Sequence, residues 1–280
     1  MRILSYTFET TVEFSSPVRD HDFVLRCMPH TRPGLQTVLD AHVMIAPNGP
    51  LAKQVDGFGN ILRIGRARAA HSMFSFASSG MVLVNGGVGA EDPGNVETWV
   101  HPVFLQPSAL ACADASLAAF AQSIRYSVEF DARFAGEDDG GAWEIAQALS
   151  HTVHARLKYE MGVTTVETTS TEAFAMGCGV CQDFSHVLVA ACRSVGIPAR
   201  YVNGLMVGEG ATHAWVEVHD GSMWRGLDPT NDRVVDDGYI TFCHGRDVSD
   251  IPIEQGVFKG NAAQEQSIII RVTDQASRSI

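Results

Sequence analysis

Apolar and polar residues alternate along the first 14 positions of the chain. One parity carries Leu4, Tyr6, Phe8, Thr10, Val12 and Phe14. The other parity is polar from Ser5 to Glu13, and this period of two predicts a strand or hairpin with one buried face. Further strand patterns, separated by turn-forming residues, lie at 23–28, 36–46, 60–67 and 73–84. No amphipathic helix pattern precedes about residue 108, so we expect a small antiparallel β-domain in this part.

Beyond the first third, the pattern changes to helices followed by strands. Residues 85–107 are rich in glycine and proline and predict a connection between two modules. Helical patterns lie at 108–122, 142–157 and 181–195, and strand patterns lie at 199–207, 212–219, 223–228 and 266–273. We therefore predict an α+β fold, with a β-rich N-terminal domain and connection at 1–105 and a core at 106–280 that includes the C-terminal strand.

The segment GCGVCQDFSHVLVAACRSV, residues 177–195, places Cys181 where a glycine-containing loop becomes a helix. The apolar stripe of this helix consists of Phe184, Val187, Leu188, Ala191, Cys192 and Val195. A thiol in the first turn lies among unpaired N–H groups near the positive end of the helix dipole, which stabilises the thiolate. Cys181 is therefore a candidate nucleophile. The alternative is a small apolar residue that begins a core helix.

A thiol nucleophile needs a base, and the base needs a third group that orients it. His186 follows Cys181 by five residues, which places it well around the helix from the thiol. His213 is a better candidate, because it lies in the alternating segment THAWVEV and Asp228 ends the next strand pattern, after one hairpin turn. Trp215 shares the face of His213, so it either borders the substrate channel or is a half-buried strand aromatic.

Two neighbours of Cys181 admit other interpretations. Cys178 and Cys181 form a C-x-x-C pair, but no strand pattern leads into it as in a dithiol oxidoreductase, and a zinc site would need a second ligand pair. We keep the hypothesis that a reversible Cys178–Cys181 disulfide inactivates the nucleophile. Asp183 is predicted to be structural, because an acid in the first turn of a helix interacts favourably with the dipole.

Composition and charge narrow the range of partners. The chain has 280 residues, 45% of them hydrophobic, which is ample for a core. A formal net charge of -12, without a run rich in lysine and arginine, argues against nucleic acid and against an anionic membrane surface. The N-terminus lacks the apolar run of a signal peptide and no segment is apolar enough to span a bilayer, so we expect a cytoplasmic protein. Six scattered cysteines indicate no disulfide framework.

Three blocks of the sequence resemble the signatures of the transglutaminase-like superfamily, whose members are papain-related cysteine enzymes. They are GVCQDFSH followed by GIPARYV, then THAWVEV, then LDPTN, in the family order. The N-terminal third with DGFGN, and the tail GRDVSDIPIEQGVFKG, are similar to bacterial members that carry a β-rich N-terminal domain. The resemblance implies a papain-like core in which Cys181 is the nucleophile, His213 the general base and acid, and Asp228 the residue that orients the imidazole.

The chemistry implied by this resemblance is acyl transfer through a thioester, on a peptide or carboxamide substrate. The backbone N–H of Cys181 would help to hold the oxyanion, and a second donor is not assigned. Hydrolysis, as by a protease or amidase, is the preferred expectation. The alternatives are transamidation of protein glutamine and a non-catalytic scaffold or binding module. No cofactor or metal is implied, a peptide or protein is the expected partner, and the oligomeric state is not predicted.

Overall fold

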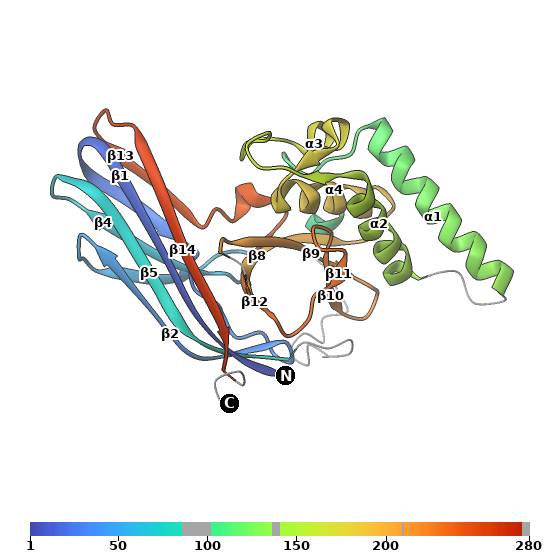
Figure 1. Ribbon diagram of the computed structural model, residues 1–280, viewed down its shortest axis with the longest axis horizontal. Helices are drawn as coiled ribbons and strands as arrows, with labels where there is room; N and C mark the ends of the chain where they lie inside the picture. The colour runs from blue at the N-terminus through green and yellow to red at the C-terminus, as the bar shows by residue number, and fades with distance from the viewer. Residues whose placement is uncertain (86–101, 136–140, 209, 276–280) are drawn as a thin grey trace.

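A large antiparallel β-sheet lies against a smaller α+β core in this protein (Figure 1). The computed structural model describes residues 1–85, 102–135, 141–208 and 210–275. The α+β class predicted from the sequence is confirmed by this arrangement. Within the described ranges, no helix is both long and apolar enough to cross a membrane.

Strand β1 (Arg2–Leu25) is the centre of the large sheet. The other strands of this sheet are β2 (Gln36–Ala46), β3 (Leu51–Val55), β4 (Ile61–Ala67), β5 (His71–Val84), β13 (Glu254–Lys259) and β14 (Gln264–Asp274). The first half of β1 pairs with β5 and β14, and its second half pairs with β4 and β13. The two strand segments predicted at the N-terminus are thus one strand, which changes register between Glu13 and Val18 and can bend there.

One face of the large sheet is buried, as the alternation in the sequence predicted. The predicted apolar parity of β1, namely Leu4, Tyr6, Phe8, Thr10, Val12 and Phe14, is buried throughout. Rings of Tyr6 and Phe8 lie 5.5 and 6.0 Å from the ring of Phe242, which belongs to the core. The same face therefore forms the hydrophobic contact between the sheet and the core.

The chain returns to the N-terminal sheet at its C-terminal end. Strand β14 pairs with β1 from Leu4 opposite Asp274 to Phe14 opposite Gln264. We expected the C-terminal strand to belong to the core, and this part of the domain prediction is wrong, because the open edge of β1 is the hydrogen-bonding partner of β14. Most of the predicted connection, residues 86–101, lies outside the described residues.

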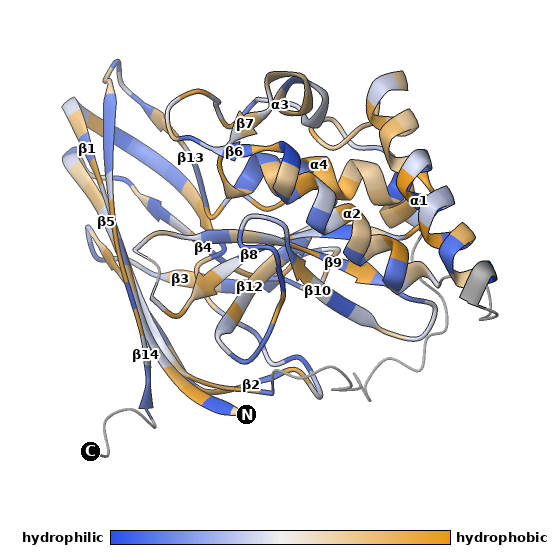
Figure 2. Cartoon of the chain, turned by 45° about the vertical axis from the view of Figure 1, so that its right-hand side comes forward, coloured by the Kyte–Doolittle hydropathy of each residue, from blue (hydrophilic) through white to orange (hydrophobic). Residues whose placement is uncertain are grey.

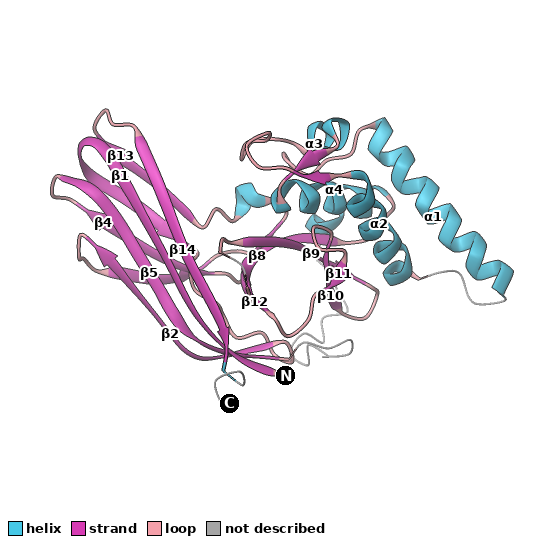
Figure 3. Cartoon of the chain, in the orientation of Figure 1, coloured by secondary structure: helices cyan, strands magenta, loops and turns pink. Residues whose placement is uncertain are grey.

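The core combines a curved five-stranded sheet with helices gathered on one side of it (Figure 3). Its sheet has the order β11 (Arg233–Val234), β10 (Trp224–Asp228), β9 (His213–His219), β8 (Ala199–Met206) and β12 (Tyr239–Gly245). The helices are α1 (Ala115–Ala135), α2 (Ala142–Arg156), α3 (Ser170–Met176) and α4 (Cys181–Ser194). Short elements are the 3-10 turns Pro102–Leu105 and Val248–Asp250 and the parallel pair β6 (Lys158–Tyr159) and β7 (Cys178–Gly179). Helix α4 lies at the centre, in contact with β8, β9 and the other three helices (Figure 2).

Two helix boundaries differ from the predicted ones because of capping. Helix α1 begins at Ala115 rather than near residue 108, since Oδ1 of Asp114 accepts the N–H of Leu117 at 2.8 Å. Helix α3 was not predicted. It begins after Thr169, whose hydroxyl accepts the N–H of Glu172 while the Glu172 carboxylate accepts the N–H of Thr169. This capping box lies at the end of the threonine-rich segment 164–171.

Polar side chains of the large sheet and its loops bind the free edge of β12. The side-chain amide of Gln36 pairs with both the N–H and the C=O of Thr241, at 2.9 and 2.8 Å. The amide of Asn60 does the same at His244, with both distances 2.8 Å. Backbone groups that an edge strand leaves unpaired are thereby satisfied across the domain contact.

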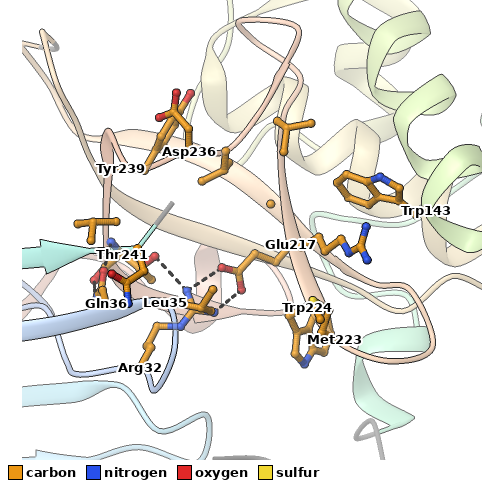
Figure 4. Close-up of a pocket in the computed structure, with 16 residues that line it drawn as sticks. Arg32, Leu35, Gln36, Trp143, Glu217, Met223, Trp224, Asp236, Tyr239 and Thr241 are labelled. Carbon is orange, nitrogen blue, oxygen red and sulfur yellow. Dashed lines mark hydrogen bonds and ion pairs between the residues drawn. The ribbon is translucent and has the colours of Figure 1, made fainter. Parts of the chain in front are cut away.

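A buried ion-pair cluster reinforces the same contact. The guanidinium of Arg32 binds both carboxylate oxygens of Glu217, at 2.7 and 2.9 Å (Figure 4). Arg200 binds Oε2 of Glu217 at 2.6 Å. The paired arginines hold the pKa of Glu217 well below its usual value despite complete burial. Arg32 precedes β2 and Glu217 lies in β9, so the cluster joins the large sheet to the core.

Candidate active site

Cys181 is the first residue of α4, as the sequence predicted. The preceding helix α3 ends at Gly177, which adopts a left-handed conformation with φ of 70°. Gly179 then passes close to Asp183, and a Cβ on Gly179 would lie 2.5 Å from the Asp183 carboxylate. Oδ2 of Asp183 accepts the N–H of Val180 and the hydroxyl of Thr164, both at 2.8 Å. Asp183 thus acts as the capping residue that places Cys181 at the start of α4.

His213 lies between Cys181 and Asp228. Its Nε2 is 2.7 Å from Oδ2 of Asp228, and its side chain is 4% exposed whereas that of Asp228 is fully buried. Burial opposes the charged imidazolium, yet hydrogen bonds with Asp228 and with the Cys181 thiol raise the pKa of His213 to about 10. The structure therefore brings the three residues singled out in the sequence together at one site.

Both oxygens of the Asp228 carboxylate accept hydrogen bonds from several donors. Besides His213, Oδ2 accepts the Tyr239 hydroxyl at 2.7 Å and the side-chain amide of Asn231 at 2.8 Å. Oδ1 accepts the backbone N–H groups of Thr230 and Asn231 at 3.0 and 3.2 Å. Burial by itself would raise the pKa of Asp228, but the side-chain hydrogen bonds from His213, Asn231 and Tyr239 lower it below its usual value. Asp228 is thus held as a carboxylate.

Sequence reasoning missed Asn231 and Tyr239. The signal for Asn231 was present in LDPTN, because an asparagine three residues after an aspartate can close an Asx turn. Tyr239 begins β12, a strand that was not predicted, and its hydroxyl also accepts a hydrogen bond from Nε of Arg233 at 2.7 Å. No local sequence pattern pointed to that tyrosine.

Trp215 is fully buried in β9, so it does not border an open channel. Its ring stacks beside that of His213 at 6.3 Å and meets the Tyr239 ring edge-on at 5.3 Å. The expectation of a channel residue or a half-buried aromatic is corrected accordingly, because Val202, Met206 and Tyr239 pack with this side chain in a buried cluster. Trp215 supports the positions of the His213 and Tyr239 rings from behind.

The other candidates near the thiol occupy separate places. Nε2 of His186 accepts the N–H of Val248 at 3.2 Å and its ring packs on Tyr201, so it is not the partner of Cys181. Cys178 lies in β7 opposite Lys158 of β6, and both Cys178 and Cys181 are free thiols. The proposed disulfide between them stays a prediction.

A small cavity of about 80 Å³ lies beside the buried Arg32–Glu217 ion pair (Figure 4). Glu217, Trp143 and Tyr239 are among the side chains around it, whereas Cys181 and His213 are not. A cavity of this size has room for a few water molecules. It is too small for a peptide segment.

Two family models match parts of this chain. The family model of the transglutaminase-like superfamily matches residues 128–229, and that of the bacterial transglutaminase-like N-terminal region matches residues 4–83. Residues 128–229 thus match a transglutaminase-like core, and residues 4–83 match a bacterial transglutaminase-like N-terminal region. The first match contains Cys181, His213 and Asp228, and the second covers most of the large sheet.

Relatives of this transglutaminase-like protein include two uncharacterized mycobacterial proteins. One, from Mycobacterium leprae, is 28% identical over 258 residues, which span 85% of this chain and 87% of the relative. The other, from Mycobacterium tuberculosis, is 36% identical over 142 residues, 45% of each chain. A crystal structure from Cytophaga hutchinsonii, named as a candidate cysteine protease, superposes with a TM-score of 0.72 at 20% identity and covers 98% of this chain and 91% of its own. That likeness concerns the fold.

Proposed function

We propose that this protein catalyses cysteine-dependent acyl transfer on a peptide or carboxamide substrate. The Cys181 sulfur attacks the substrate carbonyl carbon, and the carbonyl oxygen becomes an oxyanion near the backbone N–H of Cys181 at the start of α4. The imidazolium of His213 then gives its proton to the departing amine as the C–N bond breaks, which leaves a thioester on Cys181.

In the second half of the reaction, His213 takes a proton from water, and the resulting hydroxide equivalent attacks the thioester. The products are a carboxylic acid and the free enzyme. A primary amine in place of water would give transamidation. We prefer hydrolysis, and a protein or peptide is the partner that this chemistry requires.

The observation that best supports this proposal is the position of His213. Its ring is buried, and it is hydrogen-bonded to Asp228 on one side and to the Cys181 thiol on the other. A protonated imidazole beside a thiol favours the thiolate, and a carboxylate behind the imidazole fixes its orientation. A scaffold without turnover would have no need of this arrangement.

The test combines thiol labelling with product analysis. We expect iodoacetamide to alkylate Cys181 before the other cysteines at neutral pH, and we expect Cys181→Ala to abolish turnover. The matched control is Cys112→Ser, because Cys112 is a partly buried cysteine outside the site. Incubation with a peptide library, with and without a labelled primary amine, separates hydrolysis from transamidation by product mass. Labelling of Cys181 no faster than that of a model thiol would speak against the proposed nucleophile.

A further inference from the structure

A cleft of about 670 Å³ separates the large sheet from the core beside the candidate active site. Phe8, Thr10, Glu254 and Gln266 contribute from the large sheet, and Asn203 and Thr212 contribute from the core. Its volume falls in the range of sites that bind small ligands or short peptide segments. In Figure 1, β13 and β14 lie on one side of this region and the chain between α2 and α3 on the other.

One end of the cleft adjoins the catalytic residues. Thr212, which lines it, directly precedes His213 in the chain. Val166 also lines it, and its carbonyl accepts a hydrogen bond at 3.4 Å from the side chain of Gln182, the residue after Cys181. A substrate whose amide lies at Cys181 can therefore extend into this cleft.

Two buried polar atoms in the cleft wall have no hydrogen-bond partner. They are Oγ1 of Thr10, whose residue is 2% exposed, and Oδ1 of Asn203, whose residue is 8% exposed. Buried polar atoms without partners are costly and rare in folded proteins. A peptide backbone offers N–H and C=O groups that would satisfy both atoms.

The charge of the cleft is negative. Glu254 and Glu167 are its two ionisable side chains among the described lining residues, which include no lysine, arginine or histidine. The Glu254 carboxylate accepts one hydrogen bond, from Gln266 at 3.2 Å, and burial raises the pKa of Glu254 to about 7. A cation next to this carboxylate would offset the cost of its burial.

We propose that this cleft binds the substrate segment next to the attacked amide, and that Glu254 selects a lysine or arginine side chain in that segment. The assignment of the attacked amide rests on the proposed function. Thr10 and Asn203 would bind the backbone of the same segment, so that the large sheet supplies the selectivity and the core supplies the chemistry.

The test uses the full chain and peptide pools that carry lysine, norleucine or glutamate at one fixed position. For the wild-type protein at pH 8 we expect kcat/KM for the preferred lysine pool to exceed that for norleucine by about tenfold, the effect typical of one partly buried ion pair. Glu254→Gln should remove this preference and Glu254→Lys should reverse it toward glutamate. The preference should also weaken below pH 7, where Glu254 becomes protonated.

Glu265→Gln is the matched control, because Glu265 is an exposed residue of β14 next to Gln266 and faces the opposite side of the strand. It should keep the lysine preference. Binding of the same pools to Cys181→Ala, with and without Glu254→Gln, reports on the cleft without turnover.

Outcomes for the cleft and for the proposed function can be told apart. If the protein turns over peptides but shows no lysine preference, or a preference that Glu254→Gln leaves unchanged, the cleft assignment is overturned and the acyl-transfer proposal stands. Absence of turnover, together with lysine binding to Cys181→Ala that Glu254→Gln removes, overturns the function and supports the cleft. If no pool shows binding or turnover that depends on Glu254, the cleft assignment is wrong.

Discussion

At the scale of single residues, hydrogen bonds fix the carboxylate of Asp228 beside His213. Its two oxygens accept five hydrogen bonds, of which two come from other strands, from His213 of β9 and from Tyr239 of β12. Tyr239 in turn accepts a hydrogen bond from Arg233. This chain of donors keeps Asp228 ionised, so that it can stabilise the imidazolium of His213.

Replacing Tyr239 by phenylalanine tests this chain. We expect Tyr239→Phe to lower kcat/KM about tenfold, because a hydrogen bond to a charged group is worth roughly 1.5–3 kcal/mol. Loss of the donor raises the pKa of Asp228 from its lowered value, so the acid limb of the kcat/KM profile should move to higher pH. Tyr126→Phe, at a tyrosine that is 64% exposed on α1, is the control. A loss of stability with an unmoved acid limb would mean that Tyr239 acts by packing alone.

The Cys178–Cys181 hypothesis also belongs to this scale. Mild peroxide would oxidise both thiols to a disulfide, with loss of two hydrogens and reduction of the peroxide to water. We expect dithiothreitol to restore full activity to the wild-type protein, whereas Cys178→Ser should be oxidised further at Cys181 and recover less. Peptide mass mapping would detect the disulfide. Equal activity with and without reductant after peroxide treatment would rule it out, and Cys112→Ser is the control.

At the scale of elements, the turn from α3 through β7 into α4 positions Cys181, the proposed nucleophile. Gly177 ends one helix in a left-handed conformation, Gly179 leaves space for the Asp183 carboxylate, and Asp183 caps the next helix. The apolar stripe of α4 packs on β9, the strand that carries His213. The distance between thiol and imidazole thus depends on the packing of one helix against one strand.

Gly179→Ala tests this dependence. The added Cβ would lie 2.5 Å from Asp183, so the cap must shift and carry Cys181 with it. We expect kcat/KM to fall by about two orders of magnitude, because a displacement of ~1 Å at a reacting group has an effect of that size. The rate of iodoacetamide labelling should fall too. Gly57→Ala, where no atom lies within 4 Å of the added Cβ, should behave as the wild type. Full activity of Gly179→Ala would show that the cap is adjustable.

At the scale of the whole molecule, polar groups bind the large sheet to the core. His30 and His244 lie across this contact with ring centroids 6.4 Å apart, close to Arg32, Arg200 and Glu217. Burial lowers the pKa of His30 to about 4 and that of His244 well below its usual value. Both histidines are therefore neutral in the folded protein at pH values where the unfolded chain is protonated.

This difference predicts a loss of stability in acid. Between pH 6.5 and about 4 the unfolded state binds a proton at His30 that the folded state does not, so the free energy of unfolding falls as pH falls. Urea unfolding at pH 7 and pH 5 should show less acid destabilisation for His30→Gln than for the wild type, by roughly 1–2 kcal/mol. Glu254 has a raised pKa, so its contribution to the free energy of unfolding increases as pH falls, opposite to that of His30. Each variant is therefore compared with the wild type, in which Glu254 contributes equally. His42→Gln, at an exposed histidine, is the control, and an equal pH dependence of both variants would contradict the prediction.

Local sequence patterns predicted where helices and strands lie better than they predicted which of these elements pair or pack together. The alternation in β1, the stripe of α4 and the strand of His213 all appeared at the expected residues, because a strand or helix depends on the periodicity of neighbouring side chains. Cys181, His213 and Asp228 were named from the sequence, but their proximity came from the family resemblance. Tyr239 and the cleft around Glu254 were missed, since each depends on elements far apart in the chain.

By itself, the sequence determined the fold class, the buried face of β1 and the residue types at the candidate site. Only the tertiary structure decided that the C-terminal strands join the N-terminal sheet, that Trp215 is closed off from solvent, and that Glu254 lines the same cleft as Thr212, the residue before His213. The physical reason is that periodicity records which side chains must be buried, whereas the choice of the strand edge or helix that buries them is made by hydrogen bonding and packing between distant segments.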